Sequence, residues 1–472
     1  MRAAALLGAA VLTLGVAGAA TAPSPFSMTT TAERDAAYQL GLEAYVYGLP
    51  LVTTDATFRT MTSVTASQGA FGPVNRFNHD RGSNGASSTA VVAPGATSLS
   101  SIAWLDLSAE PQVITIPPIA GRGWMLALID PYTENVRMLS SAVPTAPGEY
   151  VIAGPGQGDA AIPSGAQRVD VDQDRVWVIG SIELRGPDDA AAVNQIQDGF
   201  SITPLSHAGT TWQAPVASPA VTTVTQATIP TGVAWFDALG DLLARFPPPA
   251  ADEPELARLA QVGIGPGRHP STDPSLGTEA LRGLADAVAD GPKQLTEDTG
   301  QLVATSAKVH DGYLLGGFGR YGTDYAERAV ITEIGLGAVV PEQAVYAMAW
   351  NDAAGVALDG SSSYVLHLPG PPPGREGWSL TVYDLHGALV ANPLDRYAFT
   401  NHAALTTNAD GSVDLLLGPT QPADAAQAAN WLPTPSGEGF EVAWRVFAPD
   451  PAALPGILDG TGWQPLAVTP AG

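Results

Sequence analysis

Two carboxyl groups and a phenol at alternate positions give the sequence its most direct acid–base pattern. Asp130, Tyr132 and Glu134 stand in the segment DPYTEN, so in an extended chain they share one face. Two carboxyls whose pKa values are separated by burial can act as the acid and the base of a hydrolysis. We therefore take these three residues as candidate catalytic residues. A strand end followed by a loop is the non-catalytic interpretation of the same segment.

Arginine, asparagine and aromatic residues gather nearer the C-terminus. Asn392, Arg396 and Tyr397 occur in NPLDRY, and Asn430 and Trp431 occur in NWLP. A guanidinium fork, side-chain amides and aromatic rings can hold a carboxylate or a sugar. The set therefore predicts binding of a small-molecule or glycan ligand. The alternative is that Arg396 forms an internal ion pair and that the rings belong to the core.

His79 and Arg81 extend the predicted binding set. They occur in VNRFNHDRGSNG, which is rich in Gly, Asn and Ser. Loops of this composition often carry binding residues on a rigid scaffold. A solvated loop without a ligand is the alternative interpretation.

Two further acidic patterns favour turns over chemistry. Asp384 and His386 close the apolar run WSLTVYDLHG, where an Asp-x-x-Gly segment is typical of a bend. Asp170, Asp172 and Asp174 alternate as in a calcium loop, but the sixth position is not Gly and the twelfth is Ser181, so the EF-hand pattern fails. A looser calcium site at these acids stays open.

Motifs of the common enzyme classes are absent or stand in the wrong structural context. The segment GFGRYG at residues 317–322 fits the dinucleotide fingerprint, but its surroundings predict helices and not a βαβ unit. The sequence has no G-x-S-x-G, H-E-x-x-H or P-loop, and its seven His show no metal-ligand spacing. We expect neither a metal nor another cofactor.

Composition restricts the partners. The chain has 472 residues, 45% hydrophobic and 14% charged, with a formal net charge of −25. Nucleic acid is excluded as a partner because its phosphates require clustered Lys and Arg, and an anionic membrane surface is disfavoured for the same reason. There is no cysteine, so stability comes from packing and not from disulfides.

The first 22 residues predict export. Arg2 is followed by an apolar stretch rich in Ala and Gly and then by Ala20-Thr21-Ala22, the order of a cleavable signal peptide. A membrane anchor is the alternative, although the stretch is short of the ~20 strongly apolar residues of a span. We expect a secreted, periplasmic or cell-envelope protein that does not stay inserted in a membrane after cleavage. The oligomeric state is left open.

Hydrophobic periodicity predicts a multidomain α+β protein. One amphipathic helix begins near residue 29 and ends at Gly48 and Pro50, and short alternating runs between residues 88 and 185 predict antiparallel strands. Helical patterns follow at 233–246, 253–264, 275–291 and 294–309, and strands resume after residue 346. The expected architecture is two antiparallel, jelly-roll-like β-sandwiches with a helical middle. Its boundaries are a signal peptide at 1–22, a sandwich at 23–205, a mainly helical section at 206–345 and a sandwich at 346–472.

Both β regions resemble known domain families. The segments AYVYGLPLV, VNRFNHDR, AWLDLSAEP, DPYTEN, GEYVIAGPG and GPDD…VNQIQDGFSITPLS are similar to the domain of unknown function 1254. GWSLTVYD, ANPLDRYAF, NADGSVDLLLGP and NWLPTPSGEGF are similar to the domain of unknown function 1214, which usually follows it. The resemblance spreads in order over nearly the whole mature chain. It implies two β-sandwich domains with a helical section and no established activity.

One stretch departs from the family pattern. Where such proteins usually show Pro-Asn-Asn-Asp-Thr-Leu-Tyr-Ser, residues 94–101 read PGATSLSS. The amides, the acid and the phenol are missing, so a family site that used them would be altered here. Two functions follow from the sequence. One is a metal-independent hydrolase of a neutral or carboxylated, carbohydrate- or ester-like substrate in an inter-domain cleft, and the other is a non-catalytic ligand-binding or envelope-associated protein.

Overall fold

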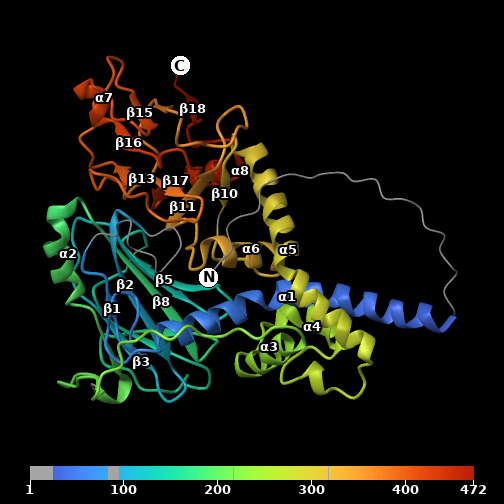
Figure 1. Ribbon diagram of the computed structural model, residues 1–472. Coiled ribbons are helices and arrows are strands. Elements are labelled where there is room, and N and C mark those ends of the chain that lie inside the picture. Colours follow the sequence, from blue (N-terminus) through green and yellow to red (C-terminus); the bar gives the residue numbers. More distant parts are fainter. Residues whose placement is uncertain are drawn as a thin grey trace, which may run out of the picture. The chain divides into compact units, whose positions relative to one another are not determined.

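A computed structural model of the chain describes residues 25–82, 85, 95–143, 145–215, 217–316 and 318–471. The predicted signal peptide and the predicted strand at 88–94 lie outside these ranges. The chain divides into two compact units, Met1–Val52 with Ile229–Glu297 and Thr53–Thr228 with Asp298–Gly472. Helices and strands carry the labels of Figure 1.

The first unit is helical. It contains most of α1 (Pro25–Met61), all of α3 (Val233–Arg245) and α4 (Glu253–Leu259), and the first part of α5 (Thr278–Val309). Small residues let α1 and α5 approach each other closely: a Cβ added to Gly41 would lie 2.7 Å from Ala287, and one added to Gly291 would lie 2.6 Å from the Tyr45 ring. At these glycines the backbone of one long helix therefore packs directly against side chains of the other.

Both long helices continue through a proline, contrary to the sequence-based prediction. The prediction that the first helix ends at Gly48 and Pro50 is wrong, because α1 runs on to Met61. Likewise, the segments 275–291 and 294–309 form one helix, α5, around Pro292. Residues beside Pro50 are buried, with Leu49 7% and Leu51 1% exposed. Packing of this kind outweighs the one helical hydrogen bond that a proline removes.

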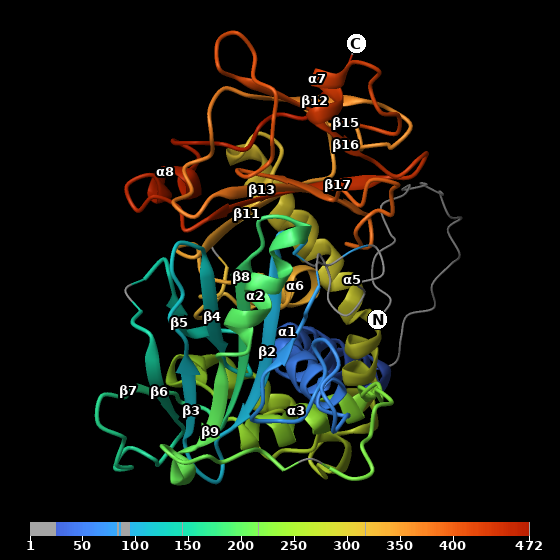
Figure 2. The ribbon, with the colours of Figure 1, turned by 90° about the vertical axis from the view of Figure 1, so that its left-hand side faces the viewer.

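The described residues of the second unit form four sheets. The first β-sandwich joins a sheet of order β1-β2-β8-β4-β5 to one of order β7-β6-β3-β9 (Figure 2). All pairings in these sheets are antiparallel except β6–β7. The strands are β1 (Asn78–His79), β2 (Ser98–Asp106), β3 (Gln112–Ile116), β4 (Trp124–Ile129), β5 (Asn135–Ser140), β6 (Gly148–Ala153), β7 (Gln167–Asp170), β8 (Arg175–Glu183) and β9 (Ser201–Pro204).

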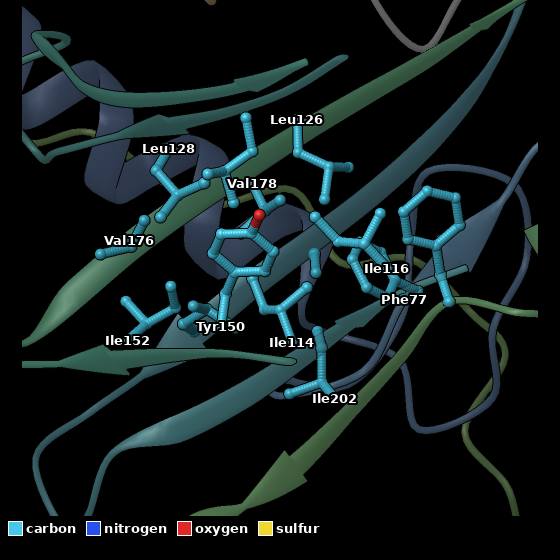
Figure 3. Packing of buried hydrophobic residues seen from close by; sticks show 14 of the residues in the cluster. Phe77, Ile114, Ile116, Leu126, Leu128, Tyr150, Ile152, Val176, Val178 and Ile202 are labelled. Atoms are coloured by element: carbon cyan, nitrogen blue, oxygen red, sulfur yellow. The ribbon is translucent and has the colours of Figure 1, made fainter. Parts of the chain in front are cut away.

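Alternate residues of these strands fill the first core. Val176 and Val178 of β8 face Ile114 of β3 and Ile152 of β6 across the sandwich (Figure 3). Full burial of such side chains stabilises a fold by about 1.5–3 kcal/mol each. The intervening residue, Trp177, points to the opposite face of the sheet, where it belongs to a separate apolar cluster.

The second β-sandwich repeats this plan. A sheet of order β10-β11-β17-β13-β14 packs on one of order β16-β15-β12-β18 around a core that includes Leu366, Leu380, Leu415 and Trp444. Among the described strands of these sheets, β15 and β16 pair in parallel and the other pairings are antiparallel. The strands are β10 (Leu314–Gly316), β11 (Ala344–Ala349), β12 (Tyr364–Leu368), β13 (Trp378–Asp384), β14 (Ala398–Thr400), β15 (Val413–Gly418), β16 (Trp431–Pro433), β17 (Phe440–Phe447) and β18 (Thr469–Pro470).

The two sandwiches also pack against each other. Trp104 of β2 and Trp177 of β8 stack with ring centroids 4.9 Å apart, and Ala344 and Phe447 of the second sandwich belong to the same apolar cluster. Sheets β2-β8-β4 and β11-β17 therefore bury residues on both faces, which explains why their strands read as nearly continuous apolar runs. The remaining helices are α2 (Ala190–Gln197), α6 (Tyr325–Gly335), α7 (Ala425–Ala429) and α8 (Leu454–Asp459).

The predicted fold class, a multidomain α+β protein with two mostly antiparallel β regions and helices between them in sequence, is confirmed. Every helix within the described ranges is too short or too polar to cross a bilayer.

Candidate functional site

A cavity lies where the two sandwiches meet. Its volume is about 60 Å³, and it is lined by the end of β8, the start of β4, the start of β11 and the turn after β14. The polar residues of its wall include Glu183, Glu376, Asn401 and His402, and its aromatic lining residues are Trp124, Tyr346, Trp378 and Phe447. Such a mixture of apolar walls and a few convergent polar groups is typical of ligand sites.

Glu183 and His402 form the shortest polar contact in this wall. Glu183 ends β8 and His402 follows β14, and their Oε1 and Nε2 atoms are 2.6 Å apart. The Glu183 side chain is mostly covered, with 16% of its surface exposed, whereas the His402 side chain is more open to solvent, with 34% exposed. The contact joins residues 219 positions apart. It depends on the packing of one sandwich against the other.

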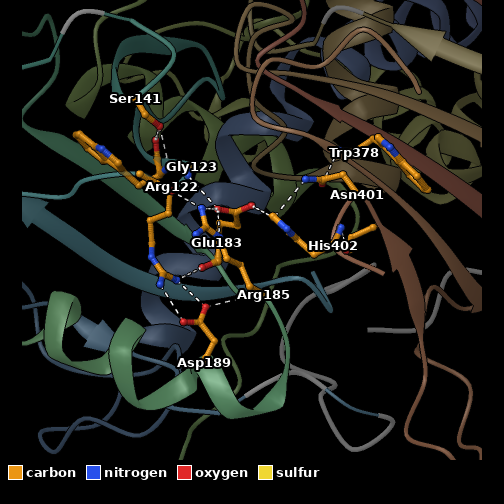
Figure 4. A network of polar contacts seen from close by, with 12 residues as sticks. Arg122, Gly123, Ser141, Glu183, Arg185, Asp189, Trp378, Asn401 and His402 are labelled. Carbon is orange, nitrogen blue, oxygen red and sulfur yellow. Dashed lines mark hydrogen bonds and ion pairs between the residues drawn. The ribbon is translucent and has the colours of Figure 1, made fainter. Parts of the chain in front are cut away.

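Positive charge and a backbone amide hold the Glu183 carboxylate. Arg185 donates to Glu183 Oε2 from Nε (3.1 Å) and Nη2 (3.0 Å), and the Gly123 N–H donates to the same oxygen at 3.3 Å. Figure 4 shows Glu183 flanked by Arg185 and His402. A glutamate carboxylate only accepts hydrogen bonds. His402 Nε2 must therefore carry the proton and donate it to Glu183.

A second ion pair supports the Glu183 end of the wall. Arg122 donates to the Glu183 carbonyl oxygen at 2.8 Å and to both carboxylate oxygens of Asp189 at 2.7 and 2.9 Å. This fork lowers the pKa of Asp189 to about 2. The Arg122–Asp189 pair is mostly shielded from solvent, with 11% and 19% of the side chains exposed, so it fixes the strand end that carries Glu183.

Glu376 adds a second carboxyl group to the cavity. Its Oε2 atom lies 3.1 Å from where a Cβ on Gly123 would be, so Gly123 separates the two acids and leaves room for both. Burial raises the pKa of Glu376, and the nearby Glu183 raises it further, while the Ser141 hydroxyl and Arg375 act in the opposite direction. Glu376 thus keeps its proton to a higher pH than an exposed glutamate does.

The Glu183–His402 pair can perform acid–base chemistry. With Nε2–H donated to Glu183, the other ring nitrogen, Nδ1, has no hydrogen-bond partner among the described residues. A neutral imidazole fixed in one tautomer by a carboxylate can take a proton at its second nitrogen and return it later. Asn401 Oδ1 accepts the Trp378 N–H at 3.3 Å, so the amide next to His402 is held in place.

The predicted catalytic residues lie elsewhere, together in the turn from β4 to β5. Asp130 Oδ1 accepts the N–H groups of Tyr132 (2.9 Å) and Glu134 (3.0 Å). The Glu134 carboxylate accepts those of Tyr321 (3.1 Å) and Gly322 (3.0 Å). These contacts make the acids part of a loop-to-loop junction, and within the described part of the chain none of the three predicted residues lines the cavity.

The fingerprint-like segment is also explained by this junction. Gly317 is outside the described residues, but the following residues form the loop between β10 and α6, and β10 pairs antiparallel with β11. The parallel βαβ unit of a dinucleotide site is therefore not what surrounds this loop. Its backbone N–H groups hold the chain's own Glu134 carboxylate.

The predicted binding residues near the C-terminus bond mainly to backbone. Arg396 Nη1 donates to the carbonyl oxygens of Ala428 (3.1 Å) and Trp431 (3.0 Å), and Asn392 Nδ2 donates to the Arg396 carbonyl at 3.0 Å. Other bonds in this set are Asn430 Nδ2 to Thr406 O (2.8 Å), Trp431 Nε1 to Gly418 O (3.0 Å) and Tyr397 OH to Asp395 Oδ1 (3.1 Å). The structure therefore brings Asn392, Arg396 and Trp431 together, away from the cavity wall.

His79 and Arg81 form a third group. His79 Nδ1 is 2.8 Å from Ser101 Oγ, and burial together with Arg81 lowers the pKa of His79 to about 4. Arg81 donates to the Asn194 carbonyl and pairs with Asp198 at 2.7 Å. The predicted catalytic and binding residues thus lie in three separate places, and their roles in catalysis and binding stay predictions.

The turn interpretation of Asp384 and His386 is confirmed. Asp384 Oδ1 accepts the N–H groups of His386 (2.8 Å) and Ala388 (2.9 Å), and Gly387 has a positive φ of 71°. In the calcium-like stretch, Asp170 pairs with Arg168 at 2.7 Å. Throughout the described ranges, no three His, Asp or Glu side chains come together as metal ligands would.

Sequence reasoning missed Glu183 and His402. Glu183 is the last residue of an apolar strand and His402 follows a strand of three residues, so neither stands in a recognisable motif. The alternation of apolar residues along β8 can be recognised in the sequence, and it places Glu183 on the face of the sheet opposite the first core. A sequence alone gave no reason to connect that face with a histidine so far along the chain.

The chain is similar to known families and to solved structures. Residues 74–204 match the family model described as protein of unknown function (DUF1254), and residues 343–451 match the one described as protein of unknown function (DUF1214). The VPA0106 protein from Vibrio parahaemolyticus has a similar structure, with a TM-score of 0.66 and 22% identity over 92% of this chain and 100% of that one. An uncharacterised protein from Burkholderia cenocepacia has a TM-score of 0.42 and 12% identity over 94% and 95% of the two chains. No curated protein matches the chain.

Proposed function

We propose that this chain, which carries a DUF1254 domain followed by a DUF1214 domain, hydrolyses a small ester- or carbohydrate-like substrate in the cavity at Glu183 and His402. The observation that carries the proposal is the 2.6 Å contact between His402 Nε2 and Glu183 Oε1. The lining residues fall between 97 and 184 in one matched domain and between 343 and 447 in the other. This suits the inter-domain cleft expected from the sequence.

The proposed reaction needs water as its only co-reactant. For an ester, His402 Nδ1 takes a proton from a water molecule while the water oxygen forms a bond to the carbonyl carbon. When the carbon–oxygen bond to the leaving group breaks, the imidazolium returns that proton to the departing oxygen. The products are a carboxylic acid and an alcohol. Glu183 stabilises the imidazolium charge and keeps Nδ1 free for the proton.

Size limits the substrate. At about 10–15 Å³ for each water position, the 60 Å³ cavity admits a group of about four to six non-hydrogen atoms. This fits a small acyl or alkyl group and not a long glycan within the cavity. The small volume also supports the alternative, a non-catalytic protein that recognises a small polar ligand.

The test is hydrolysis by a matched pair of histidine variants. Acid release from small acetate and propionate esters is followed in a pH-stat for the full chain. His402→Gln should lower kcat/KM about 10²–10⁴-fold, because it removes the proton acceptor. His367→Gln is the control: its Nδ1 also pairs with a carboxylate, Asp414, at 2.7 Å, but on an exposed surface.

Two results would reject the hydrolase. One is equal loss of activity in both histidine variants, and the other is no ester or small glycoside cleaved above the buffer rate. Ligand binding without turnover would favour the non-catalytic alternative. Export through residues 1–22 belongs to the same proposal and is supported by the charged, apolar and small-residue order of that segment.

A further inference from the structure

The charged side chains that line the cavity are acidic. Glu183 and Glu376 both contribute to its wall, and no Lys or Arg is among its lining residues in the part of the chain that the structure describes. The other titratable residues in the wall are His402 and Tyr346. A ligand with a carboxylate would therefore meet two acids, whereas a ligand with a cationic group would meet complementary charge.

Aromatic rings complete the wall. Trp124, Tyr346, Trp378 and Phe447 line the cavity together with Met125. The face of an aromatic ring attracts a cation within about 6 Å of its centre, most strongly for Trp. Carboxylates beside such rings form the kind of environment in which proteins hold ammonium groups. The apolar edges of the same rings can accept the hydrocarbon part of an amine.

A buried hydroxyl near the cavity has no partner among the described residues. Ser379 is 0% exposed, and its Oγ atom accepts and donates no hydrogen bond. In the sheet, Ser379 is directly opposite Thr400, which lines the cavity, so the two side chains share one face. A buried hydroxyl of this kind is costly unless water bonds to it, and Ser379 itself is not a lining residue of the cavity.

The nearby arginines are engaged outside the lining. Arg185 bonds to Glu183 and to the Gly121 carbonyl, and Arg122 holds Asp189. Arg375 donates to the Ala142 carbonyl. Arg445 lies across from Ser379 on β17, with its guanidinium carbon 5.5 Å from the Tyr383 ring centre and 5.9 Å from that of Tyr346. Arg445 is the group that would favour an anion, so an anionic probe belongs in the test.

We propose that the substrate or ligand of this cavity carries a protonated amine, held by Glu376 and Glu183 beside the rings of Tyr346 and Phe447. This inference rests on the cavity assigned under the proposed function and replaces the neutral or carboxylated substrate expected from the sequence. The amine-bearing portion has about four to six non-hydrogen atoms. Small amino alcohols and their esters are in this class.

Binding of an amine should release a proton. Burial raises the pKa of Glu376, the Ser141 hydroxyl and Arg375 lower it, and Glu183 raises it. An ammonium group beside it favours the ionised carboxylate, so the bound state has the lower Glu376 pKa. Affinity for an amine then increases as pH rises through the titration of Glu376, and levels off above it.

The test is a charge series of similar shape. Propylammonium, 1-propanol and propionate are titrated separately into the full chain by calorimetry. Propylammonium should bind about tenfold or more tightly than 1-propanol, and propionate most weakly. Glu376→Gln should remove most of the preference for propylammonium over 1-propanol. Glu438→Gln, at an exposed turn, is the control and should leave it unchanged.

Three results would overturn the proposal. They are no binding of propylammonium, equal or tighter binding of 1-propanol or propionate, and an unchanged preference in Glu376→Gln. The outcome is separable from that of the hydrolase test, because binding is measured without turnover. Amine binding with no His402-dependent hydrolysis would reject the proposed reaction and keep the ligand class. Hydrolysis of neutral esters without amine binding would keep the proposed reaction and reject the amine as the ligand class.

Discussion

At the scale of single residues, an unremarkable strand-end glutamate has a larger role than the polar motifs of the sequence. Glu183 receives donors from Arg185, Gly123 and His402, and each comes from a different part of the chain. By contrast, Arg396 and Asn430 satisfy backbone groups of their own sandwich. The residue types were visible in the sequence, but their partners were set by tertiary packing.

The Asp130 turn gives a prediction about pH and stability. Burial raises the pKa of Asp130 from 3.8 to about 7. The folded protein therefore binds more protons here than the unfolded chain between about pH 4 and 7, and the free energy of unfolding falls as pH rises through that window. Glu441, whose pKa burial also raises to about 7, contributes in the same direction.

Asp130→Asn should flatten this dependence. The substitution removes the charge but keeps Oδ1, which accepts the N–H groups of Tyr132 and Glu134. Between pH 5 and 8, the free energy of unfolding of the variant should fall by on the order of 1–3 kcal/mol less than that of the wild type. Urea unfolding at several pH values measures it, with exposed Asp172→Asn as the control. An identical slope in the variant and the wild type would contradict the account.

At the scale of elements, strands were easier to predict than the ends of helices. The apolar runs at β3, β6, β8, β13 and β17 are strands, because alternation and turn residues agree with burial on their two faces. The helix ends were misplaced at Pro50 and Pro292. A proline signals a helix end only when nothing else compensates, and here neighbouring buried side chains do.

Close packing of α1 against α5 gives a second prediction. Gly291→Ala would place a Cβ 2.6 Å from the Tyr45 ring, so one helix must shift. We expect a loss of about 1–3 kcal/mol in the free energy of unfolding. Gly300→Ala in the same helix is the control, since nothing lies within 4 Å of its added Cβ, and it should be neutral or stabilising by up to about 1 kcal/mol. Thermal unfolding followed by circular dichroism compares them, and equal stability of the two variants would be the contrary result.

At the scale of the molecule, the candidate site exists because two separate β-sandwiches each have a second apolar face. Trp104 and Trp177 of one sandwich and Phe447 of the other belong to one cluster, and the cavity lies in the same layer. Sequence patterns predicted both sandwiches and a cleft between domains but not which sheets meet, because alternation specifies which residues face inward and not which sheet covers the other face. The site is therefore a property of the pair of domains.

The central claim is that Glu183 and His402, brought together from the two domains, act as one unit. A double-mutant cycle on kcat/KM for small-ester hydrolysis tests it directly, using Glu183→Gln, His402→Gln and the double variant in the full chain. Because each change disables the same proton transfer, the double variant should lose about as much as His402→Gln alone. Losses that multiply, or a Glu183→Gln variant as active as the wild type, would contradict the account.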